Sequence, residues 1–374
     1  MKKNNIPLKP INNIYKVNLK VRKNEKVLVF TDNFDKKLQD IAKLIAEKGR
    51  SHTTKMCYME IRTTSSHGAE PPESLWQAAY GERAVRAIKL KKLFTPLLGK
   101  KINDKQLKKI EGIIGRFKKD SVRAVIALSY HSTTHTRFRS LLTGICGTRY
   151  ASMPLFDPSM LSGAMTVNWR KMEKKTKKIA QRVNKSEKLE IKTPNGTFIM
   201  FSKKGRKAKT DTGIITRPGS SSNLPAGEVY FAPIEGTANG RLVLDWAPTR
   251  KLKRPVTLHV KKGKVTKVEG KERFVNYLKA KLAEREENAN IAELGIGTND
   301  KASKPDNILE SEKILGTIHI ALGDNSSFGG KISTPFHQDF VFFRPTVTLI
   351  HKDNKKELLL KNGRLCKAGS VKTV

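Results

Sequence analysis

The chain has 374 residues and a formal net charge of +40 at pH 7, because 74 Lys and Arg oppose only 34 Asp and Glu. Apolar residues are spread along the whole length, which excludes a disordered chain, and none of their runs approaches the roughly 20 residues of a transmembrane helix. Three scattered cysteines exclude a disulfide framework, and the first residues lack the apolar core of a secretory signal, so we expect a cytoplasmic protein with no membrane segment.

The first half of the chain alternates between strand and helix patterns. Apolar residues recur with period two in some segments and at helical spacing in others. The expected strands are 25–31, 53–61 and 122–129, and the expected helices are one ending at Gly49, 74–90, 104–118 and about 134–143. Such alternation predicts a parallel α/β sheet in roughly the first 165 residues.

The second half is richer in hairpin signals. Asn195-Gly196 separates two strand patterns within 188–202, and Gly263 separates two more within 256–270. A single helix is expected at about 271–286, and the basic segment 168–188 has a helical pattern. We therefore predict an N-terminal parallel α/β domain over residues 1–186. A β-rich α+β metal-binding domain is expected over residues 187–374.

The basic charge has two interpretations. Such a field would attract nucleic acid or acidic ligands. The basic runs, such as residues 171–178, are mostly lysine and contain few aromatic residues. Arginine and stacking aromatics are what phosphate and base recognition favour. A solvated lysine surface is therefore preferred, and a protein that binds nucleic acid through a non-specific basic surface remains a further hypothesis.

Most candidate functional residues lie in the segment 287–344, where acidic side chains outnumber basic ones. His337 and Asp339 stand two apart in the apolar run FHQDFV, so both leave the same face of a strand. An imidazole and a carboxylate that project together form half of a site for Zn²⁺, Co²⁺, Mn²⁺ or Fe²⁺. The pair alone is a weak signal, because two residues with this spacing occur by chance in many chains.

Three further residues extend this candidate site. His319 lies in the apolar, strand-like run TIHIALG (317–323). Glu228 directly follows Gly227 and Glu293 stands two residues before Gly295, and both have apolar neighbours. Taken singly, such a histidine is usually a hydrogen-bonded core residue, and such a glutamate caps a turn or pairs with lysine. Buried carboxylates are costly without a partner, and a shared cation would serve them all. Their convergence favours a metal site.

His131 and His135 stand at helical i, i+4 spacing after the strand expected at 122–129. The glutamate of an HExxH motif is missing, so zinc-protease chemistry is not implied. A contact with substrate at the carboxyl end of the strand is one interpretation, and helix capping is the other.

Five strings resemble the thermophilic aminopeptidase T family of metallopeptidases: NLPAGEVYFAP (223–233), NIAELGIGTN (290–299), GTIHIALGDN (316–325), FGGK (328–331) and FHQDFV (336–341). Weaker similarity covers residues 68–78, 135–144 and 148–154. The resemblance implies a homodimeric peptidase that removes N-terminal residues from peptides with water activated by two divalent ions, Zn, Co or Mn. The implied ligands are Glu228, Glu293, His319, His337 and Asp339, and we favour Glu293 as the base that accepts the proton of the water.

One position departs from that family. The peptidases carry a tyrosine near the metals seven residues after the histidine of GTIHIALG, and Ser326 stands there in this chain. The same superfamily also resembles mononuclear-iron enzymes that open dihydroxypyridine rings. A ring-cleaving Fe(II) dioxygenase is therefore the alternative to the peptidase, although the presence of Glu293 and His319 favours the peptidase.

Overall fold

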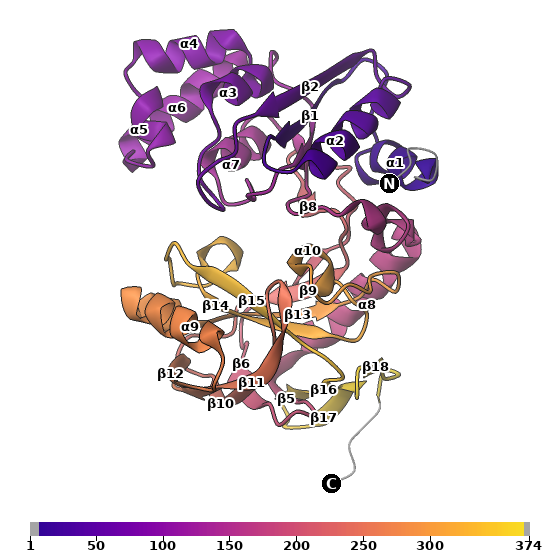
Figure 1. Ribbon diagram of the computed structural model, residues 1–374, viewed down its shortest axis with the longest axis vertical. Coiled ribbons are helices and arrows are strands. Elements are labelled where there is room, and N and C mark those ends of the chain that lie inside the picture. The colour runs from indigo at the N-terminus through magenta and orange to yellow at the C-terminus, as the bar shows by residue number, and fades with distance from the viewer. Residues whose placement is uncertain (1–6, 370–374) are drawn as a thin grey trace. The chain divides into compact units, whose positions relative to one another are not determined.

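The computed structural model describes residues 7–369, and the chain divides into two compact units (Figure 1). The first comprises Met1–Trp169 with Gly213–Pro225, and the second comprises Arg170–Thr212 with Ala226–Val374. This division differs from a single boundary at residue 186 in two respects. Helix α8 (Trp169–Lys185) belongs mainly to the second unit because Ile179 and Val183 are part of that unit's core. Residues 213–225 return to the first unit because β8 (Ser221–Asn223) pairs with its sheet.

The first unit is built on a five-stranded parallel sheet of order β2-β1-β3-β4-β8. Its other strands are β1 (Lys26–Asp32), β2 (Lys55–Ile61), β3 (Ala124–Leu128) and β4 (Arg149–Ser152). Its helices are α1 (Leu8–Asn13), η2 (Ile14–Asn18), α2 (Lys36–Gly49), α3 (Glu73–Tyr80), α4 (Glu82–Leu90), α5 (Phe94–Leu98), α6 (Asp104–Phe117), α7 (Arg137–Gly144), η3 (Pro158–Leu161) and η4 (Ala164–Thr166).

Two expected helices of this unit differ in detail. The pattern at 74–90 forms two helices, α3 and α4, which are separated at Gly81. Helix α7 begins at Arg137, because the Thr136 side chain accepts a hydrogen bond from the Arg139 amide and caps the helix there. His131 and His135 precede the cap, so they are not one helical turn apart on a common face.

The second unit contains two antiparallel sheets. The larger has the order β12-β11-β10-β6-β5-β16-β17-β18 and the smaller has the order β15-β14-β13-β9-β7. The strands of the larger sheet are β5 (Ser186–Lys192), β6 (Phe198–Ser202), β10 (Asn239–Ala247), β11 (Arg250–Lys261), β12 (Lys264–Glu269), β16 (Thr346–His351), β17 (Lys356–Lys361) and β18 (Arg364–Leu365). The strands of the smaller sheet are β7 (Lys209–Asp211), β9 (Glu228–Phe231), β13 (Ile291–Gly297), β14 (Ile318–Gly323) and β15 (His337–Phe342). The remaining helices are α9 (Arg273–Glu284), η5 (Glu286–Ala289), α10 (Ile308–Ser311) and η6 (Ser326–Phe328).

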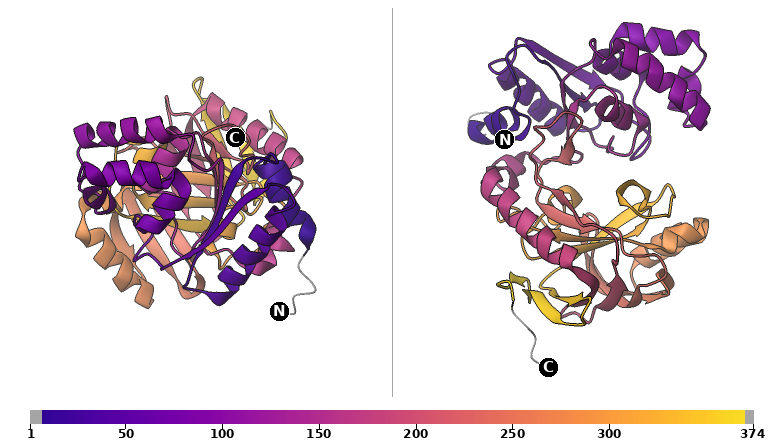
Figure 2. Two further views of the ribbon diagram at one scale, coloured as in Figure 1. Left: turned by 90° about the horizontal axis from the view of Figure 1, so that it is seen from above. Right: turned by 180° about the vertical axis from the view of Figure 1, so that it is seen from behind.

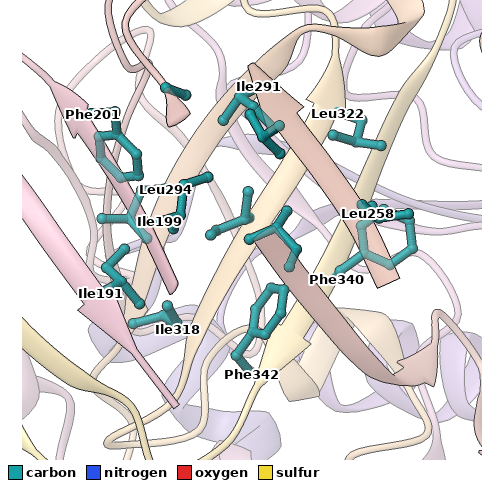
Figure 3. Packing of buried hydrophobic residues seen from close by; sticks show 14 of the residues in the cluster. Ile191, Ile199, Phe201, Leu258, Ile291, Leu294, Ile318, Leu322, Phe340 and Phe342 are labelled. Atoms are coloured by element: carbon teal, nitrogen blue, oxygen red, sulfur yellow. The ribbon is translucent and has the colours of Figure 1, made fainter. Parts of the chain in front are cut away.

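One hydrophobic core joins the two sheets of this unit. Figure 3 shows Ile191, Ile199 and Phe201 of the larger sheet facing Leu294 and Ile318 of the smaller one. Helix α8 adds its apolar face to the same core, and Figure 2 shows it running along the strands when the molecule is seen from behind. Each fully buried Leu, Ile or Phe side chain contributes roughly 1.5–3 kcal/mol relative to exposure, so this core fixes the smaller sheet firmly.

The parallel sheet of the first unit and the antiparallel sheets of the second confirm the predicted fold class, an α/β domain combined with a β-rich domain. The segment 168–188 forms helix α8 over residues 169–185, whereas residues 186–188 begin β5, and the lysines of α8 lie on its solvent side. Across residues 7–369, none of the helices combines the length and the apolar character that crossing a bilayer requires.

Candidate metal centre

One face of the smaller sheet in the second unit carries the predicted ligands. Asp339 of β15 is paired with Ala321 of β14, and Ala321 is paired with Glu293 of β13. His337 and His319 each stand two residues before one of these positions, so their side chains share that face. Four groups from three adjacent strands thus converge because of strand register alone.

Glu228 reaches the same face from the next strand. It begins β9 and is paired with Gly297, which lies two residues beyond Gly295 on β13. Gly295 is in turn paired with His319. The alternation of side chains therefore places Glu228 on the side of the sheet that carries the histidines.

The opposite face of these strands is apolar. Val229, Leu294, Ile320 and Phe340 point into the core that the two sheets share. The alternation of apolar residues and candidate ligands thus gives each strand one face for stability and one for chemistry. The ligand face stays open because glycine and alanine occupy its other positions on β13 and β14, namely Gly295, Gly297, Ala321 and Gly323.

The five polar groups form a continuous series. His319 Nε2 lies 3.6 Å from Glu228 Oε2 and 3.5 Å from Glu293 Oε1. His337 Nε2 lies 3.6 Å from Glu293 Oε2 and 3.5 Å from Asp339 Oδ2. These separations exceed good N–H···O hydrogen bonds. They resemble the spacing of about 3.4 Å between ligands that surround one ion at bond lengths of roughly 2.0–2.2 Å.

Hydrogen bonding prepares His337 to bind a metal. Its Nδ1 donates to the carbonyl oxygen of Asp324 at 2.8 Å, so the neutral ring presents the unprotonated Nε2 to Glu293 and Asp339. This second contact is the usual way in which proteins orient a metal-binding histidine. One ligand atom from each of Glu293, His337 and Asp339 lies within 4.8 Å of the others.

Two buried polar atoms support the same assignment. Glu228 Oε2 and His319 Nδ1 lack a hydrogen-bond partner among the residues that the structure describes. An unsatisfied carboxylate oxygen in the protein interior is costly. A divalent ion held by the histidines and carboxylates would satisfy that oxygen, so the donor set fits a transition metal that accepts nitrogen and oxygen ligands.

Electrostatic coupling favours the charged forms of His319, His337 and Asp339. Although burial opposes protonation of His337, the neighbouring Asp339 and Glu293 carboxylates raise its pKa to about 10. Burial likewise opposes protonation of His319, and Glu293 with the other acidic groups raises its pKa to about 9. For Asp339, burial is outweighed by His337, which holds the pKa of Asp339 below its ordinary value. Protons thus occupy both rings at neutral pH where no metal is bound.

Two charged residues of the site escaped the sequence analysis. Lys313 and Glu312 lie just after α10, and Lys313 Nζ contacts Glu228 Oε1 at 2.8 Å and Glu312 Oε2 at 3.0 Å. The Lys313 side chain is 1% exposed. In the sequence, the string SEK at 311–313 resembles an ordinary solvated loop. The position of Glu312 and Lys313 inside the acid-rich segment 287–344 was the one feature that could have pointed to the site.

Two more polar side chains share the ligand face at its β7 side. Tyr230 is paired with Gly295, and Lys209 is paired with Tyr230. Lys209 Nζ donates to the carbonyl oxygen of Ser327, and the Tyr230 ring makes an edge contact with Phe328. Burial lowers the pKa of Lys209, whereas Glu293 opposes that change. A hydroxyl and a cation therefore border the candidate centre.

The remaining predicted site residues have other surroundings. Ser326 is exposed, and its hydroxyl donates to Asp324 Oδ1, within the loop that orients His337. His131 and His135 belong to the first unit, where His131 Nδ1 donates to the carbonyl oxygen of Thr64. The five predicted ligands come together, whereas their individual roles, including Glu293 as a base, stay predictions.

The fold and this donor set define a class of protein, namely a two-unit chain with a histidine and carboxylate centre on a sheet of its second unit. Residues 146–367 match the family described as NicX, 2,5-dihydroxypyridine 5,6-dioxygenase. The chain belongs to that family. No protein of curated function matches the sequence.

Two solved structures share the fold. The 2,5-dihydroxypyridine dioxygenase of Pseudomonas putida KT2440 is 17% identical, with a TM-score of 0.71 and 97% of each chain covered. Wild-type AmpT, the aminopeptidase T of Thermus thermophilus, is 15% identical, with a TM-score of 0.56, 96% of this chain covered and 98% of AmpT covered. At these identities the likeness concerns the fold.

The expectation of a metallo-aminopeptidase, a hydrolase of peptides, is wrong. The matched family is described as a dioxygenase, which is an oxidoreductase and not a hydrolase. The resemblance to aminopeptidase T was carried by strings that encode the ligand-bearing strands, β9, β13, β14 and β15. Such strings specify the strands and the side chains that could bind metal. The reaction also depends on the number of metal ions and on the substrate that these side chains hold.

Proposed function

We propose that this protein is a mononuclear Fe(II) dioxygenase that opens a dihydroxylated aromatic N-heterocycle, with 2,5-dihydroxypyridine as the first substrate to test. The observation that carries the proposal is the convergence of two imidazoles with carboxylates on one sheet face, in a chain of the dioxygenase family. Two histidines and one carboxylate that leave positions open are the donor set of non-haem Fe(II) oxygenases.

The residues that would hold the iron are Glu293, His337 and Asp339, whose ligand atoms lie within 4.8 Å of one another, and His319, which faces Glu293 at 3.5 Å, would complete the donor set. Ferrous iron, when bound, supplies the redox chemistry by which dioxygen enters an aromatic ring. The chain's own contribution is to fix the donor atoms. The Asp324 carbonyl orients His337, and the sheet register fixes the carboxylates.

The border of the site suits a dihydroxylated ring. The Lys209 ammonium offers a positive charge to an ionised ring hydroxyl, and the Tyr230 hydroxyl offers a hydrogen-bond donor on the same face. The aromatic edges of Phe328 and Tyr230 provide apolar surface for a flat ring. These groups would bind and orient the substrate, and Phe328 would help to exclude water.

The test is an oxygen-electrode assay on protein loaded anaerobically with Fe²⁺, with the loss of 2,5-dihydroxypyridine followed by absorbance. We expect oxygen uptake that equals substrate loss, and no uptake by His337→Ala, which lacks a ligand. A panel of other dihydroxypyridines and catechols defines the ring that is preferred. Iron-loaded protein that consumes no oxygen with any of these rings would contradict the proposal.

A further inference from the structure

Glu228 is divided between two partners. Its Oε2 faces His319 Nε2 at 3.6 Å, whereas its Oε1 accepts a hydrogen bond from Lys313 Nζ at 2.8 Å. The Lys313 ammonium also contacts Glu312 Oε2 at 3.0 Å. A cation that bridges two buried carboxylates beside a histidine is the arrangement that a second metal ion would have. Here an ammonium group has that position.

Main-chain contacts fix the position of the loop that carries Lys313. The carbonyl of Lys313 accepts a hydrogen bond from the Asn299 amide at 2.9 Å, just beyond the end of β13. The next residue packs so closely on the strand that a side chain at Gly297 would lie 2.0 Å from the Ile314 carbonyl oxygen. The position of Lys313 is therefore set by main-chain contacts and by a glycine that permits close approach.

Charge balance favours one metal ion beside this lysine. The site contains four carboxylates, from Glu228, Glu293, Glu312 and Asp339. Lys313 and Lys209, which borders the site, neutralise one charge each, and one divalent ion neutralises the remaining two. A second divalent ion bound through Glu228 Oε2 would lie beside the ammonium that holds Oε1 of the same carboxylate, and it would be repelled by that ammonium in a site from which water is largely excluded.

We propose that Lys313 replaces the second metal ion and thereby makes the centre mononuclear. This inference rests on the proposed metal-dependent function and deepens it. Two bridged ions suit the activation of water for hydrolysis. One ion leaves coordination positions for a ring and for dioxygen, which an oxygenase needs. Lys313 thus acts as a positioning residue that determines metal stoichiometry without itself being a ligand.

The experiment measures metal content instead of turnover. Wild-type protein and Lys313→Ala are each incubated with excess Mn²⁺, desalted, and analysed for manganese per chain and by electron paramagnetic resonance. We expect one Mn²⁺ per wild-type chain with the spectrum of an isolated ion. In Lys313→Ala, we expect a second Mn²⁺ and the spectrum of an exchange-coupled pair, because Glu228 and Glu312 become free to bind it.

A matched control is Lys203→Ala, which removes another buried lysine of the same unit, one that donates to the Ser186 carbonyl. It should keep one Mn²⁺ per chain. If Lys313→Ala is unfolded without metal, its folding is followed as Mn²⁺ is added. A bound ion in place of the ammonium should restore a cooperative thermal transition. Failure of Mn²⁺ to do so would overturn the inference.

The metal content also distinguishes failure of the Lys313 inference from failure of the proposed function. Two Mn²⁺ in the wild type, or one in both folded proteins, would overturn the role of Lys313 and leave a metal-dependent enzyme intact. Wild-type protein that binds no Mn²⁺ and no Fe²⁺ would instead remove the metal centre and the proposed function together.

Discussion

Gly295 and His319 lie opposite one another in neighbouring strands, and the imidazole of His319 occupies the space that a side chain at position 295 would need. A Cβ built on Gly295 would lie 1.9 Å from His319 Cε1 and 2.1 Å from Nε2. The ring can face Glu228 and Glu293 only because residue 295 has no side chain. This glycine therefore helps to form the metal centre without offering a ligand.

Gly295→Ala should displace His319 and weaken metal binding by about 10- to 100-fold, the range seen when the support of a ligand is removed. The affinity for Co²⁺ can be measured by competition with a chelator. Gly112→Ala is the control, because a Cβ there meets nothing within 4 Å, and this change in α6 should leave the affinity unchanged. Equal affinity in Gly295→Ala would show that His319 is not a ligand.

Metal affinity should rise with pH across the neutral range. Acidic neighbours raise the pKa of His319 to about 9 and that of His337 to about 10, so both rings are protonated near pH 7 without metal. A metal ion must displace both protons, and its affinity should increase by up to about 100-fold per pH unit. Chelator competition between about pH 6.5 and about pH 8.5 measures this slope. A flat profile would contradict the raised pKa values.

The metal-free protein should show the opposite trend in stability. A histidine whose pKa is raised on folding stabilises the folded state fully below its unfolded pKa of about 6.5. That contribution is lost as pH rises through about 9 and about 10, the pKa values of His319 and His337 in the folded chain. Thermal unfolding of chelator-treated protein should therefore occur at lower temperature as pH increases above 7. Added metal should remove much of this dependence.

Asp339→Asn should abolish tight metal binding, because an amide oxygen replaces an anionic ligand that lies 3.5 Å from His337 Nε2. Asp324→Asn is a matched change in the same region. Asp324 orients His337 through its main-chain carbonyl, and an asparagine retains the side-chain oxygen that accepts from Ser326 and Thr334. Elemental analysis after Fe²⁺ loading should find iron in Asp324→Asn and little in Asp339→Asn. Equal iron content in the two variants would exclude Asp339 as a ligand.

Phe340→Ala tests the apolar face beneath the site. Phe340 is 1% exposed, packs edge to face against Phe274 and belongs to the core between the two sheets. Its removal should cost about 3–5 kcal/mol in the free energy of unfolding of the second unit. Phe198→Ala, at a position that is 39% exposed, should cost much less. Denaturant unfolding compares the two, and similar losses would show that the sheets do not share a common core.

Much of the ligand set could be predicted from the sequence, because period-two alternation puts His337 and Asp339 on one face whatever the rest of the fold does. Lys313 could not be predicted, since only the folded chain shows that a lysine from a charged loop is buried between Glu228 and Glu312. The return of residues 213–225 to the first sheet also depends on pairing over a long distance. The expected homodimer, the cytoplasmic location and binding of nucleic acid stay predictions.

The fate of both oxygen atoms of dioxygen tests the central claim most directly. Iron-loaded protein is given 2,5-dihydroxypyridine under isotopically labelled dioxygen, and the product is analysed by mass spectrometry. A dioxygenase that opens the ring should place both labelled atoms in one ring-opened product, and Asp339→Asn should form none. Product that carries one labelled atom, or an unchanged ring after iron loading has been verified, would contradict the proposed reaction.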